Sequence, residues 1–351
     1  MNILVTGGCG FIGSHFVEYF LKTYPESKVI NIDKLTYAAH PDMAKHLGTL
    51  APDRYSFFQF DIADSNLKSW AKNQSFDAIV NFAAETHVDR SILDPDSFIR
   101  TNVLGVQNLL AIARENGNKR FVHVSTDEVY GSLKPSDPTS VETSQLDPNS
   151  PYAASKASAD LIALANARTY KQPVLITRCT NNYGPYQFPE KLLPLLIANA
   201  LEDKPIPVYG DGKQVRDWIY VVDHCRGIDA VLQKGRPGEI YNISSSGEAH
   251  NIDVIKKVLD MLHKPHSLIS YVGDRPAHDR RYGLNSSKIK QELGWSPKTT
   301  FEEGLKKTVD WYLSNVDWWK KVRGAEYLKY YQSNYENKFG FESKKPKEVN
   351  S

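Results

Sequence analysis

A glycine-rich turn near the N-terminus constrains the fold more than any other feature of the sequence. The short apolar run Ile3–Thr6 leads into this turn, and an apolar helical pattern follows it at once. Glycine lets such a turn adopt positive φ and lets a pyrophosphate approach the backbone, while the N-terminus of the helix presents free N–H groups. The segment therefore predicts a strand, a tight turn and a helix that bind a dinucleotide through Gly7, Gly10, Phe11, Ile12 and Gly13.

An acidic residue ends the next apolar run. Residues Val29–Asp33 are typical of a second strand, and Asp33 lies twenty residues beyond Gly13. A carboxylate at this place can accept hydrogen bonds from both ribose hydroxyls and would repel a 2′-phosphate. The sequence therefore favours NAD over NADP, with Asp33 and the following Lys34, Leu35 and Thr36 as candidate contacts.

Apolar strands alternate with helical patterns up to about residue 180. The predicted strands are Ile3–Thr6, Val29–Asp33, Tyr55–Asp61, Ala78–Phe82, Phe121–Ser125 and Val174–Arg178. This alternation predicts an α/β fold, a Rossmann-type doubly wound parallel sheet. Because ligands bind at the C-terminal ends of such strands, we expect Asp61 and Ile62 near the adenine, and residues from Phe82 to Thr86 near the cofactor ribose and nicotinamide.

The pattern changes beyond residue 180. Proline-rich and glycine-rich loops alternate with short helices, and one amphipathic helix is expected over residues 301–313. We therefore expect an NAD-binding domain over residues 1–180 and a smaller mixed α/β C-terminal substrate lobe over 181–335, with the two interleaved. Residues 336–351 are expected to form a flexible tail.

Charge and cysteine content exclude several classes of protein. The 351 residues include 43 Lys and Arg against 41 Asp and Glu, so the net charge of +2 favours neither nucleic acid nor an anionic membrane. The chain begins directly in a strand and has no long apolar segment, so we expect a soluble cytoplasmic protein. Its three cysteines (Cys9, Cys179 and Cys225) lack metal-ligand spacing, which favours free thiols and no metal.

A tyrosine and a lysine form the second part of the expected site. Tyr152 and Lys156 are four residues apart, so on a helix they share a face and the ammonium can lower the pKa of the phenol. Thr126 precedes Tyr152 by 26 residues and follows an apolar strand. A glycine turn, a terminal acid, a hydroxyl and a Tyr/Lys pair occur in the order found in short-chain dehydrogenases/reductases, which indicates a hydride-transfer site.

Two adjacent acids stand where a dehydrogenase would need only a hydroxyl. Asp127 and Glu128 directly follow Thr126, and carboxyl groups beside a hydride site indicate elimination chemistry as well as redox chemistry. Consecutive residues of a regular strand face opposite sides. The strand therefore has to end or twist near Thr126 if both carboxyl groups are to reach one substrate.

Several longer motifs identify a family. From Met1 to about Tyr335 the chain resembles the extended short-chain dehydrogenases/reductases that act on nucleotide sugars, most closely the dTDP-glucose 4,6-dehydratases. The resemblance lies in residues 83–91, 126–131, 181–191, 215–220 and 274–282. It implies a tightly bound NAD that is recycled in each turnover, Tyr152 as the base for the sugar 4-hydroxyl, Glu128 as the base at C5 and Asp127 as the acid for the leaving 6-hydroxyl. It also implies a role in the biosynthesis of deoxysugars such as rhamnose.

The resemblance implies how the nucleotide-diphosphate sugar is held. Arginine forks suit a diphosphate that is bound without a metal, and Arg216 and Arg275, with His278 and Asp279, are candidates. Further implied substrate contacts are Thr86, Thr126, Asn181, Lys191, Leu192, Pro207, Val208, Tyr209, Asn251 and Asp274. Thr101 and Asn182 are implied near NAD. A homodimer through helices near residues 103–116 and 152–169 is implied as well, although the apolar faces of these helices could equally be internal core.

The sequence leaves three alternatives open. A UDP-glucose 4,6-dehydratase would carry the same catalytic residues, and the short segment between Gly131 and Pro151, with Gly273 and Ala277 in a nucleotide-facing loop, departs from the family pattern. A nucleotide-sugar 4-epimerase would use Tyr152 and Lys156 but would leave Asp127 and Glu128 without a role. A non-catalytic NAD-binding protein predicts a damaged base or acid, whereas all four residues are intact.

Overall fold

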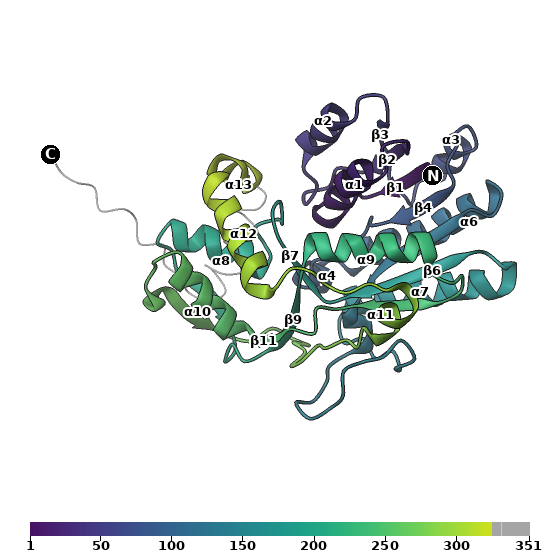
Figure 1. Ribbon diagram of the computed structural model, residues 1–351. Coiled ribbons are helices and arrows are strands. Elements are labelled where there is room, and N and C mark those ends of the chain that lie inside the picture. The colour runs from purple at the N-terminus through teal and green to yellow at the C-terminus, as the bar shows by residue number, and fades with distance from the viewer. Residues whose placement is uncertain (325–330, 332–351) are drawn as a thin grey trace. The chain divides into compact units, whose positions relative to one another are not determined.

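The N-terminal segment forms the first strand of a seven-stranded parallel sheet (Figure 1). The strands are β1 (Ile3–Thr6), β2 (Val29–Asp33), β3 (Tyr55–Gln59), β4 (Ala78–Asn81), β5 (Arg120–Thr126), β6 (Val174–Cys179) and β10 (Ile240–Ile243). Their order is β10-β6-β5-β4-β1-β2-β3, and every pair in this sheet is parallel. The order reverses direction between β1 and β4, which confirms the predicted doubly wound sheet.

Both faces of the sheet are covered by helices. The strands β1, β4 and β6 are buried along their whole length, as parallel strands with helices on both faces require. The helices of this part of the chain are α1 (Phe11–Thr23), α2 (Pro41–Leu50), α3 (Asn66–Ala71), α4 (Val88–Leu93), α5 (Pro95–Phe98), the π-helical turn η1 (Ile99–Gly105), α6 (Val106–Glu115), the 3₁₀ turn η2 (Asp127–Tyr130), α7 (Pro151–Tyr170), α9 (Val221–Lys234) and α11 (Ser287–Leu293).

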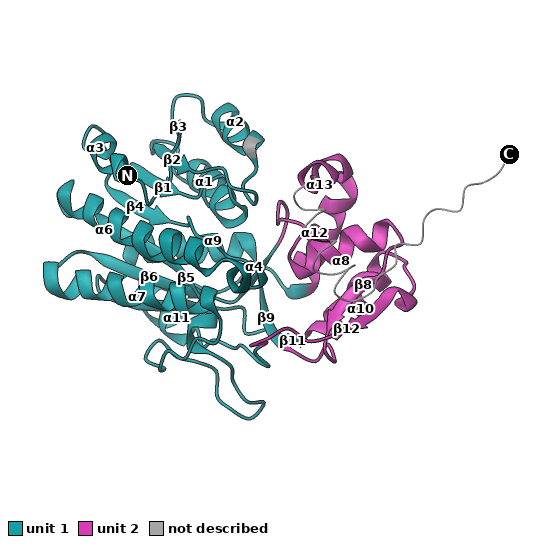
Figure 2. Ribbon diagram, turned by 180° about the vertical axis from the view of Figure 1, so that it is seen from behind, with its two compact units in different colours: residues 1–183, 215–249, 279–301 teal, residues 184–214, 250–278, 302–351 magenta. Residues whose placement is uncertain are grey.

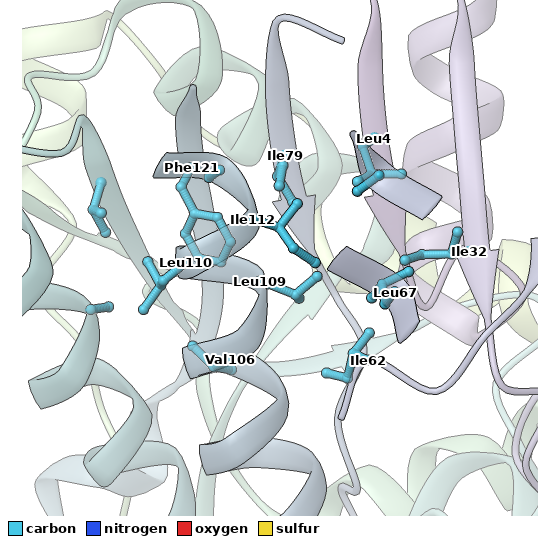
Figure 3. Packing of buried hydrophobic residues seen from close by; sticks show 14 of the residues in the cluster. Leu4, Ile32, Ile62, Leu67, Ile79, Val106, Leu109, Leu110, Ile112 and Phe121 are labelled. Carbon is cyan, nitrogen blue, oxygen red and sulfur yellow. The ribbon is translucent and has the colours of Figure 1, made fainter. Parts of the chain in front are cut away.

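One core layer lies between the sheet and helices α3, α6 and α7 (Figure 3). Leu4, Ile32, Ile79 and Phe121 point from neighbouring strands toward Leu109 and other residues of α6. Helices α1 and α9 pack against each other, and α9 also packs on β5, β6 and β10. The apolar contacts of these two layers fix the strand ends where the candidate site lies.

The described residues, 1–324 and Tyr331, divide into two units (Figure 2). Unit 1 comprises residues 1–183, 215–249 and 279–301, and unit 2 comprises the described parts of 184–214, 250–278 and 302–351. Residues 215–249 and 279–301, expected in the second lobe, thus cluster with the seven-stranded sheet. The expected tail, residues 336–351, lies outside the described residues.

Two small sheets complete the fold. The order β11-β9-β7 joins β7 (Asn181–Tyr183), β9 (Val215–Tyr220) and β11 (Glu248–His250), and β12 (Ile269–Val272) pairs in parallel with β8 (Ile206–Tyr209) in unit 2. The remaining helices are α8 (Leu192–Leu201), α10 (Asn251–Met261), the 3₁₀ turn η3 (His266–Leu268), α12 (Phe301–Ser314), which matches the expected amphipathic helix, and α13 (Val316–Val322). Within residues 1–324 and Tyr331, no helix has the length and apolar character needed to cross a membrane.

The core layer of Figure 3 predicts the effect of a cavity. Leu109 is completely buried on α6. We expect Leu109→Ala to lower the free energy of unfolding by about 3 kcal/mol, because the lost apolar contacts leave a cavity. Urea unfolding measures this change. The matched change Val141→Ala removes an exposed side chain and should have little effect; equal losses in the two variants would contradict the assignment of Leu109 to the core.

Candidate active site

The glycine turn joins β1 to α1 without room for side chains. Gly7 has a φ of +72°, and a Cβ there would lie 2.6 Å from the backbone nitrogen of Ala83. A Cβ on Gly13 would overlap the carbonyl oxygen of Gly7. Gly10 precedes α1, and no side chain caps the helix there. The first N–H groups of α1, which begins with Phe11 and Ile12, therefore have no side-chain partner and can bind an anion.

Asp33 ends β2 beside this turn. Its carboxylate accepts hydrogen bonds from the backbone N–H of Cys9 at 2.9 Å and of Leu35 at 2.8 Å. Burial raises the pKa of Asp33, although both backbone donors favour the ionised form. A carboxylate offers about four acceptor positions. Capacity therefore remains for the two ribose hydroxyls that the sequence assigns to it.

The residues expected near the adenine are already engaged within the protein. The Asp61 carboxylate lies 3.0 Å from Lys34 Nζ and 3.5 Å from a guanidinium nitrogen of Arg100. Burial alone would raise the pKa of Asp61, but the backbone N–H of Ala63 and these two cations lower it. The Ile62 side chain lies in the core layer, and its carbonyl oxygen accepts from Asn108 at 2.8 Å. A cofactor would meet Ile62 through its backbone N–H.

An asparagine positions the loop that follows β4. This loop contains Phe82, Ala83, Ala84 and Thr86, all of them half-buried. The amide of Asn102, in η1, bonds the backbone N–H and carbonyl oxygen of Glu85 at 2.9 and 3.0 Å, and donates to Ser155 Oγ at 2.8 Å. Thr101 is its neighbour in η1. The loop is thus fixed to α7, the helix that carries Tyr152 and Lys156.

Strand β5 ends at Thr126, directly before the acid pair Asp127 and Glu128, as the sequence predicted it must if both carboxyl groups are to reach one substrate. Thr126 is its last residue, and η2 begins at Asp127. The Thr126 hydroxyl accepts from the Glu128 N–H at 3.3 Å and donates to Asp127 Oδ1 at 3.2 Å. Because the strand alternation stops here, Asp127 and Glu128 are no longer forced onto opposite faces of the sheet.

The Asp127 side chain is buried, and only one of its two carboxylate oxygens has a hydrogen-bond partner among the described residues. Its Oδ2 has no hydrogen-bond partner among the described residues. Burial and the nearby Glu128 raise the pKa of Asp127 well above its usual range, and Arg216 only partly opposes this. Such a carboxyl group holds a proton at a pH where an exposed aspartate is ionised, which suits a proton donor.

Tyr152 and Lys156 lie on one face of the first turns of α7. Ser150 caps this helix by accepting from the Ala153 N–H at 3.1 Å, and Pro151 is the first helical residue. Both Tyr152 and Lys156 are buried, and Lys156 Nζ donates to the carbonyl oxygen of Val124 at 2.7 Å. The geometry holds the ammonium against β5, two residues before Thr126.

The expectation that Lys156 lowers the pKa of Tyr152 stays a prediction, and the net shift in the protein without cofactor is upward. Burial and the carboxylate of Glu128 raise the pKa of the phenol well above 10, whereas the sequence predicts that Lys156 lowers it. Burial also lowers the pKa of Lys156 to about 8, so its ammonium is still the main form at neutral pH but loses its proton just above it. The i,i+4 spacing identifies the shared helix face but contains no information about how deeply both groups are buried.

A second group of candidate residues lies in unit 1 around Arg216. Its guanidinium donates to the carbonyl oxygens of Val215 at 2.8 Å and Asp279 at 2.9 Å, and stacks on the Tyr282 ring with its Cζ 4.3 Å from the centroid. The Tyr282 hydroxyl donates to Asp279 Oδ2. Asn149 Nδ2 donates to the other oxygen of Asp279 at 2.6 Å. Arg216 is thus held rigidly, and sequence reasoning did not identify Tyr282 or Asn149.

Two asparagines in β7 differ in their surroundings. Asn181 Oδ1 is buried and has no hydrogen-bond partner among the described residues, which suits a ligand contact. Asn182 Oδ1 accepts from Nδ1 of the buried His224 at 2.8 Å, and its Nδ2 donates to the Thr180 carbonyl oxygen at 3.0 Å. Burial lowers the pKa of His224 to about 3, so this histidine is neutral and fixes the Asn182 amide.

The other candidate substrate residues belong to unit 2. Tyr209, in β8 with Pro207 and Val208, contacts the ring of His278 edge-on at 5.8 Å between centroids. His278 Nδ1 lies 2.5 Å from Asp274 Oδ1, and Gln214, which the sequence did not indicate, lies 3.3 Å from the same nitrogen. Lys191 directly precedes Leu192, the first residue of α8, and Arg275 follows Asp274. Asn251 is the first residue of α10, and its buried Oδ1 has no hydrogen-bond partner among the described residues.

The structure also shows polar residues that sequence reasoning missed. Asn81, His123, Asp160 and Arg178 are buried within or beside the sheet. The sequence contained a signal for these buried polar residues, because each interrupts a run of apolar or small residues. His123 in Phe-Val-His-Val is an example. In the described part of the chain, no three His, Cys, Asp or Glu side chains gather as metal ligands would.

Comparisons with known proteins agree over nearly the whole chain. A family model described as GDP-mannose 4,6 dehydratase matches residues 4–308. The dTDP-glucose 4,6-dehydratase of Salmonella typhimurium is 46% identical over 363 residues, which cover 96% of this chain and 100% of the relative.

Solved structures give the same result. The dTDP-glucose 4,6-dehydratase of Bacillus anthracis, in complex with NAD, has a TM-score of 0.85 at 49% identity and covers 92% of this chain and 99% of that one. The enzyme of the same name from Streptomyces venezuelae, also with NAD bound, has a TM-score of 0.87 at 49% identity, with 92% and 100% covered.

The close approach within the glycine turn can be tested directly. We expect Gly13→Ala to reduce dinucleotide binding by at least about tenfold, because the new methyl group displaces the Gly7 backbone that approaches the ligand. Calorimetric titration with NAD measures this loss. Gly48→Ala is the control, since its Cβ would lie 3.8 Å from Tyr55 in ordinary contact. Unchanged NAD affinity in Gly13→Ala would remove the turn from the cofactor site.

Proposed function

The chain belongs to the family of dTDP-glucose 4,6-dehydratases, and we propose that it converts dTDP-glucose to dTDP-4-keto-6-deoxyglucose with NAD as its cofactor. The observation that carries this proposal is the acid pair Asp127 and Glu128, directly after the end of β5 and beside the buried Tyr152 and Lys156. Oxidation at C4 needs only the tyrosine and the lysine. Loss of water from C5 and C6 needs a further base and a further acid.

The residues of unit 1 fit a bound NAD. The uncapped N-terminus of α1 would hold the pyrophosphate, Asp33 would accept the ribose hydroxyls, and Asn182 and Thr101 would lie at the nicotinamide side. When bound, NAD supplies a hydride acceptor at C4 of the sugar and returns the hydride to C6.

Tyr152 is the proposed base for the sugar 4-hydroxyl. Its phenol keeps its proton in the protein alone, because burial and Glu128 raise its pKa. Removal of the 4-hydroxyl proton by Tyr152 therefore requires positive charge nearby, and protonated Lys156 on the same helix face supplies it. Thr126, whose hydroxyl lowers the pKa of Tyr152, would orient the phenol and the sugar hydroxyl.

Glu128 and Asp127 divide the elimination between them. A ketone at C4 acidifies the C5–H bond, and the proposed base Glu128 takes that proton. The 6-hydroxyl leaves as water with the proton of Asp127, whose burial keeps it protonated. Hydride returns to C6 and Glu128 returns its proton to C5, while the proton held by Tyr152 replaces the one that Asp127 gave. The net change is the loss of one water molecule.

Substrate binding is proposed for both units. In unit 1, the buried guanidinium of Arg216 is a planar fork of N–H donors, a group that suits a diphosphate. Thr86, Asn181 and Asp279 are its proposed companions. The proposed contacts of unit 2 are Lys191, Leu192, Pro207, Val208, Tyr209, Asn251, Asp274, Arg275 and His278. We accordingly propose that the sheet of unit 1 binds NAD and that unit 2 binds the nucleotide.

A parallel assay with dTDP-glucose and UDP-glucose tests the function. Formation of a 4-keto-6-deoxy product, followed by its absorbance in alkali, supports the proposal, and the faster substrate identifies the pyrimidine. A preference for UDP-glucose would keep the mechanism and change the substrate. A 4-hydroxy epimer as the product would establish a 4-epimerase instead. The absence of any product from protein with bound NAD would exclude both dehydratases.

The role of Asp127 predicts a separation of the two half-reactions. We expect Asp127→Asn to oxidise dTDP-glucose at C4 but to form the 4-keto-6-deoxy product about 10² times more slowly, since the amide cannot protonate the leaving hydroxyl. Rapid-mixing absorbance of NADH and the alkaline product assay measure the two steps. Asp53→Asn, at an exposed loop position, is the control. A variant slowed equally in both steps would contradict the assignment of Asp127 as the acid.

We further propose a homodimer formed through unit 1. Helices α6 and α7 pack on the sheet with Leu109 and Ala163 buried, but Leu104 and Leu161 are 57% and 58% exposed on the neighbouring outer surface of η1 and α7. Leu93 on the adjacent α4 is 70% exposed. Large exposed leucines on contacting helices favour a contact between two copies. We also propose a cytoplasmic location, because all three cysteines are free and buried.

The dimer proposal predicts that a charged side chain on the exposed surface of α7 prevents dimer formation. Light scattering should give twice the chain mass of 39.6 kDa for the unmodified protein. We expect Leu161→Glu to give a single chain mass with unchanged circular dichroism, because the carboxylate cannot be buried in an apolar contact. Leu313→Glu, at an exposed leucine of α12, should stay dimeric. A dimeric Leu161→Glu variant would exclude this face as the interface.

A further inference from the structure

A line of buried polar side chains crosses the sheet below the candidate site. Thr6 Oγ1 on β1 donates to Asn81 Oδ1 on β4 at 2.6 Å, and Asn81 Nδ2 contacts His123 Nδ1 on β5 at 3.0 Å. The strand register places these three residues side by side, with Thr6 opposite Asn81 and Asn81 opposite His123. The line therefore starts one residue before the glycine turn.

The hydrogen bonds define the proton on His123. Asn81 uses its oxygen for Thr6, so its amide N–H is the donor to His123 Nδ1, and the ring proton must lie on Nε2. Burial and two nearby cations keep the pKa of His123 well below its usual range, so the ring is neutral. The Nε2–H faces Asp160 Oδ1 across 3.7 Å.

Asp160 is the anionic end of this line. It is completely buried on α7, and its Oδ2 accepts from Arg178 Nε at 2.8 Å. Burial raises the pKa of Asp160, while Arg178, Lys156 and the Ser125 hydroxyl oppose this. A buried ion pair is rarely worth more to stability than apolar residues of the same size. A role beyond stability is the better explanation for a carboxylate in this place.

Lys156, the lysine of the proposed site, is a buried cation, and the negative charge of Asp160 stabilises its protonated form. Lys156 precedes Asp160 by one helical turn, and its hydrogen bond to the Val124 carbonyl oxygen gives it no counter-ion. The titratable groups around Lys156 and Tyr152 are Asp160 on α7, Asp127 and Glu128 on η2, His123 on β5, and Cys179 and Arg178 on β6. Burial raises the pKa of both Tyr152 and Cys179, and His123 is neutral. Glu128 acts on Tyr152, whereas Asp160 is the carboxylate whose charge raises the pKa of Lys156.

We propose that Asp160 is a positioning residue that keeps Lys156 protonated, and that Arg178 keeps Asp160 ionised so that it can do so. The inference deepens the proposed function and rests on it for its consequence, since Tyr152 can act as a base only beside a positive charge. On the other side of Asp160, the neutral His123 ring lies with its Nε2 3.7 Å from Asp160 Oδ1, beyond hydrogen-bond distance.

A direct titration of Lys156 tests the proposal without any substrate. The full-length protein is labelled with ¹³C and ¹⁵N in lysine, and the Lys156 side-chain signal is identified by its loss in Lys156→Met. We expect the titration midpoint of Lys156 to fall by about one pH unit in Asp160→Asn, the usual effect of removing an opposite charge that acts on a buried ammonium. A midpoint that does not fall overturns the proposal.

Two further variants separate charge from folding. Asp160→Asn leaves Arg178 buried without its partner, so Asp160→Asn with Arg178→Gln is the variant that leaves no arginine in this position unpaired. We expect its Lys156 midpoint to fall in the same direction. Asp229→Asn is the matched control, because Asp229 is also a buried aspartate of unit 1 but binds the Tyr19 and Tyr24 hydroxyls. A fall of equal size in Asp229→Asn would show a general loss of structure and would also overturn the proposal.

The consequence for the reaction is measured separately. The first half-reaction, followed as the single-turnover appearance of NADH, should lose rate at a lower pH in the Asp160→Asn, Arg178→Gln variant than in the unmodified protein. An unchanged pH profile, with the Lys156 midpoint shifted, would overturn the role of the charge in catalysis. An unmodified protein that forms neither NADH nor keto sugar would refute the proposed function, while the titration of Lys156 would still decide the electrostatic relation.

Discussion

Strand β5 ends at Thr126, and the rest of the site depends on that end. The strand lies between β4 and β6 in the interior of the sheet, so its register and length are fixed by neighbours on both sides. The 3₁₀ turn that follows is capped by the Thr126 hydroxyl, which at the same time bonds the first acid. One threonine therefore ends the strand and orients Asp127.

The sequence predicted those features that depend on local patterns. Glycine spacing, the acid at the end of β2 and six of the seven strands follow from the alternation of apolar and turn residues, and β10 (Ile240–Ile243) was missed because four residues among loops give too weak a pattern. The fold and the family are confirmed. The individual site residues stay predictions, although unpaired buried atoms such as Asp127 Oδ2 and Asn181 Oδ1 agree with them.

What the sequence could not predict is the electrostatic environment. Lys156 was expected to lower the pKa of Tyr152, but burial shifts the pKa values of both groups toward the uncharged forms. Asp160 on α7 opposes the shift of Lys156, and only the folded sheet brings His123 of β5 and Arg178 of β6 next to Asp160. Depth below the surface is a property of the tertiary structure, and spacing along one helix cannot give it.

The order in which the segments of the two units follow one another along the chain has a consequence for folding during translation. The edge strand β10 joins the sheet only after residue 243 has been made, and residues 279–285 then bond to Leu133, Ser140 and Val215. Because synthesis proceeds from the N-terminus at roughly 5–20 residues per second, the edge of β6 remains unpaired for several seconds during translation. An exposed edge of this kind can pair with other chains. The interleaved order of segments thus leaves one edge of β6 without its native partner strand between the synthesis of β6 and of β10.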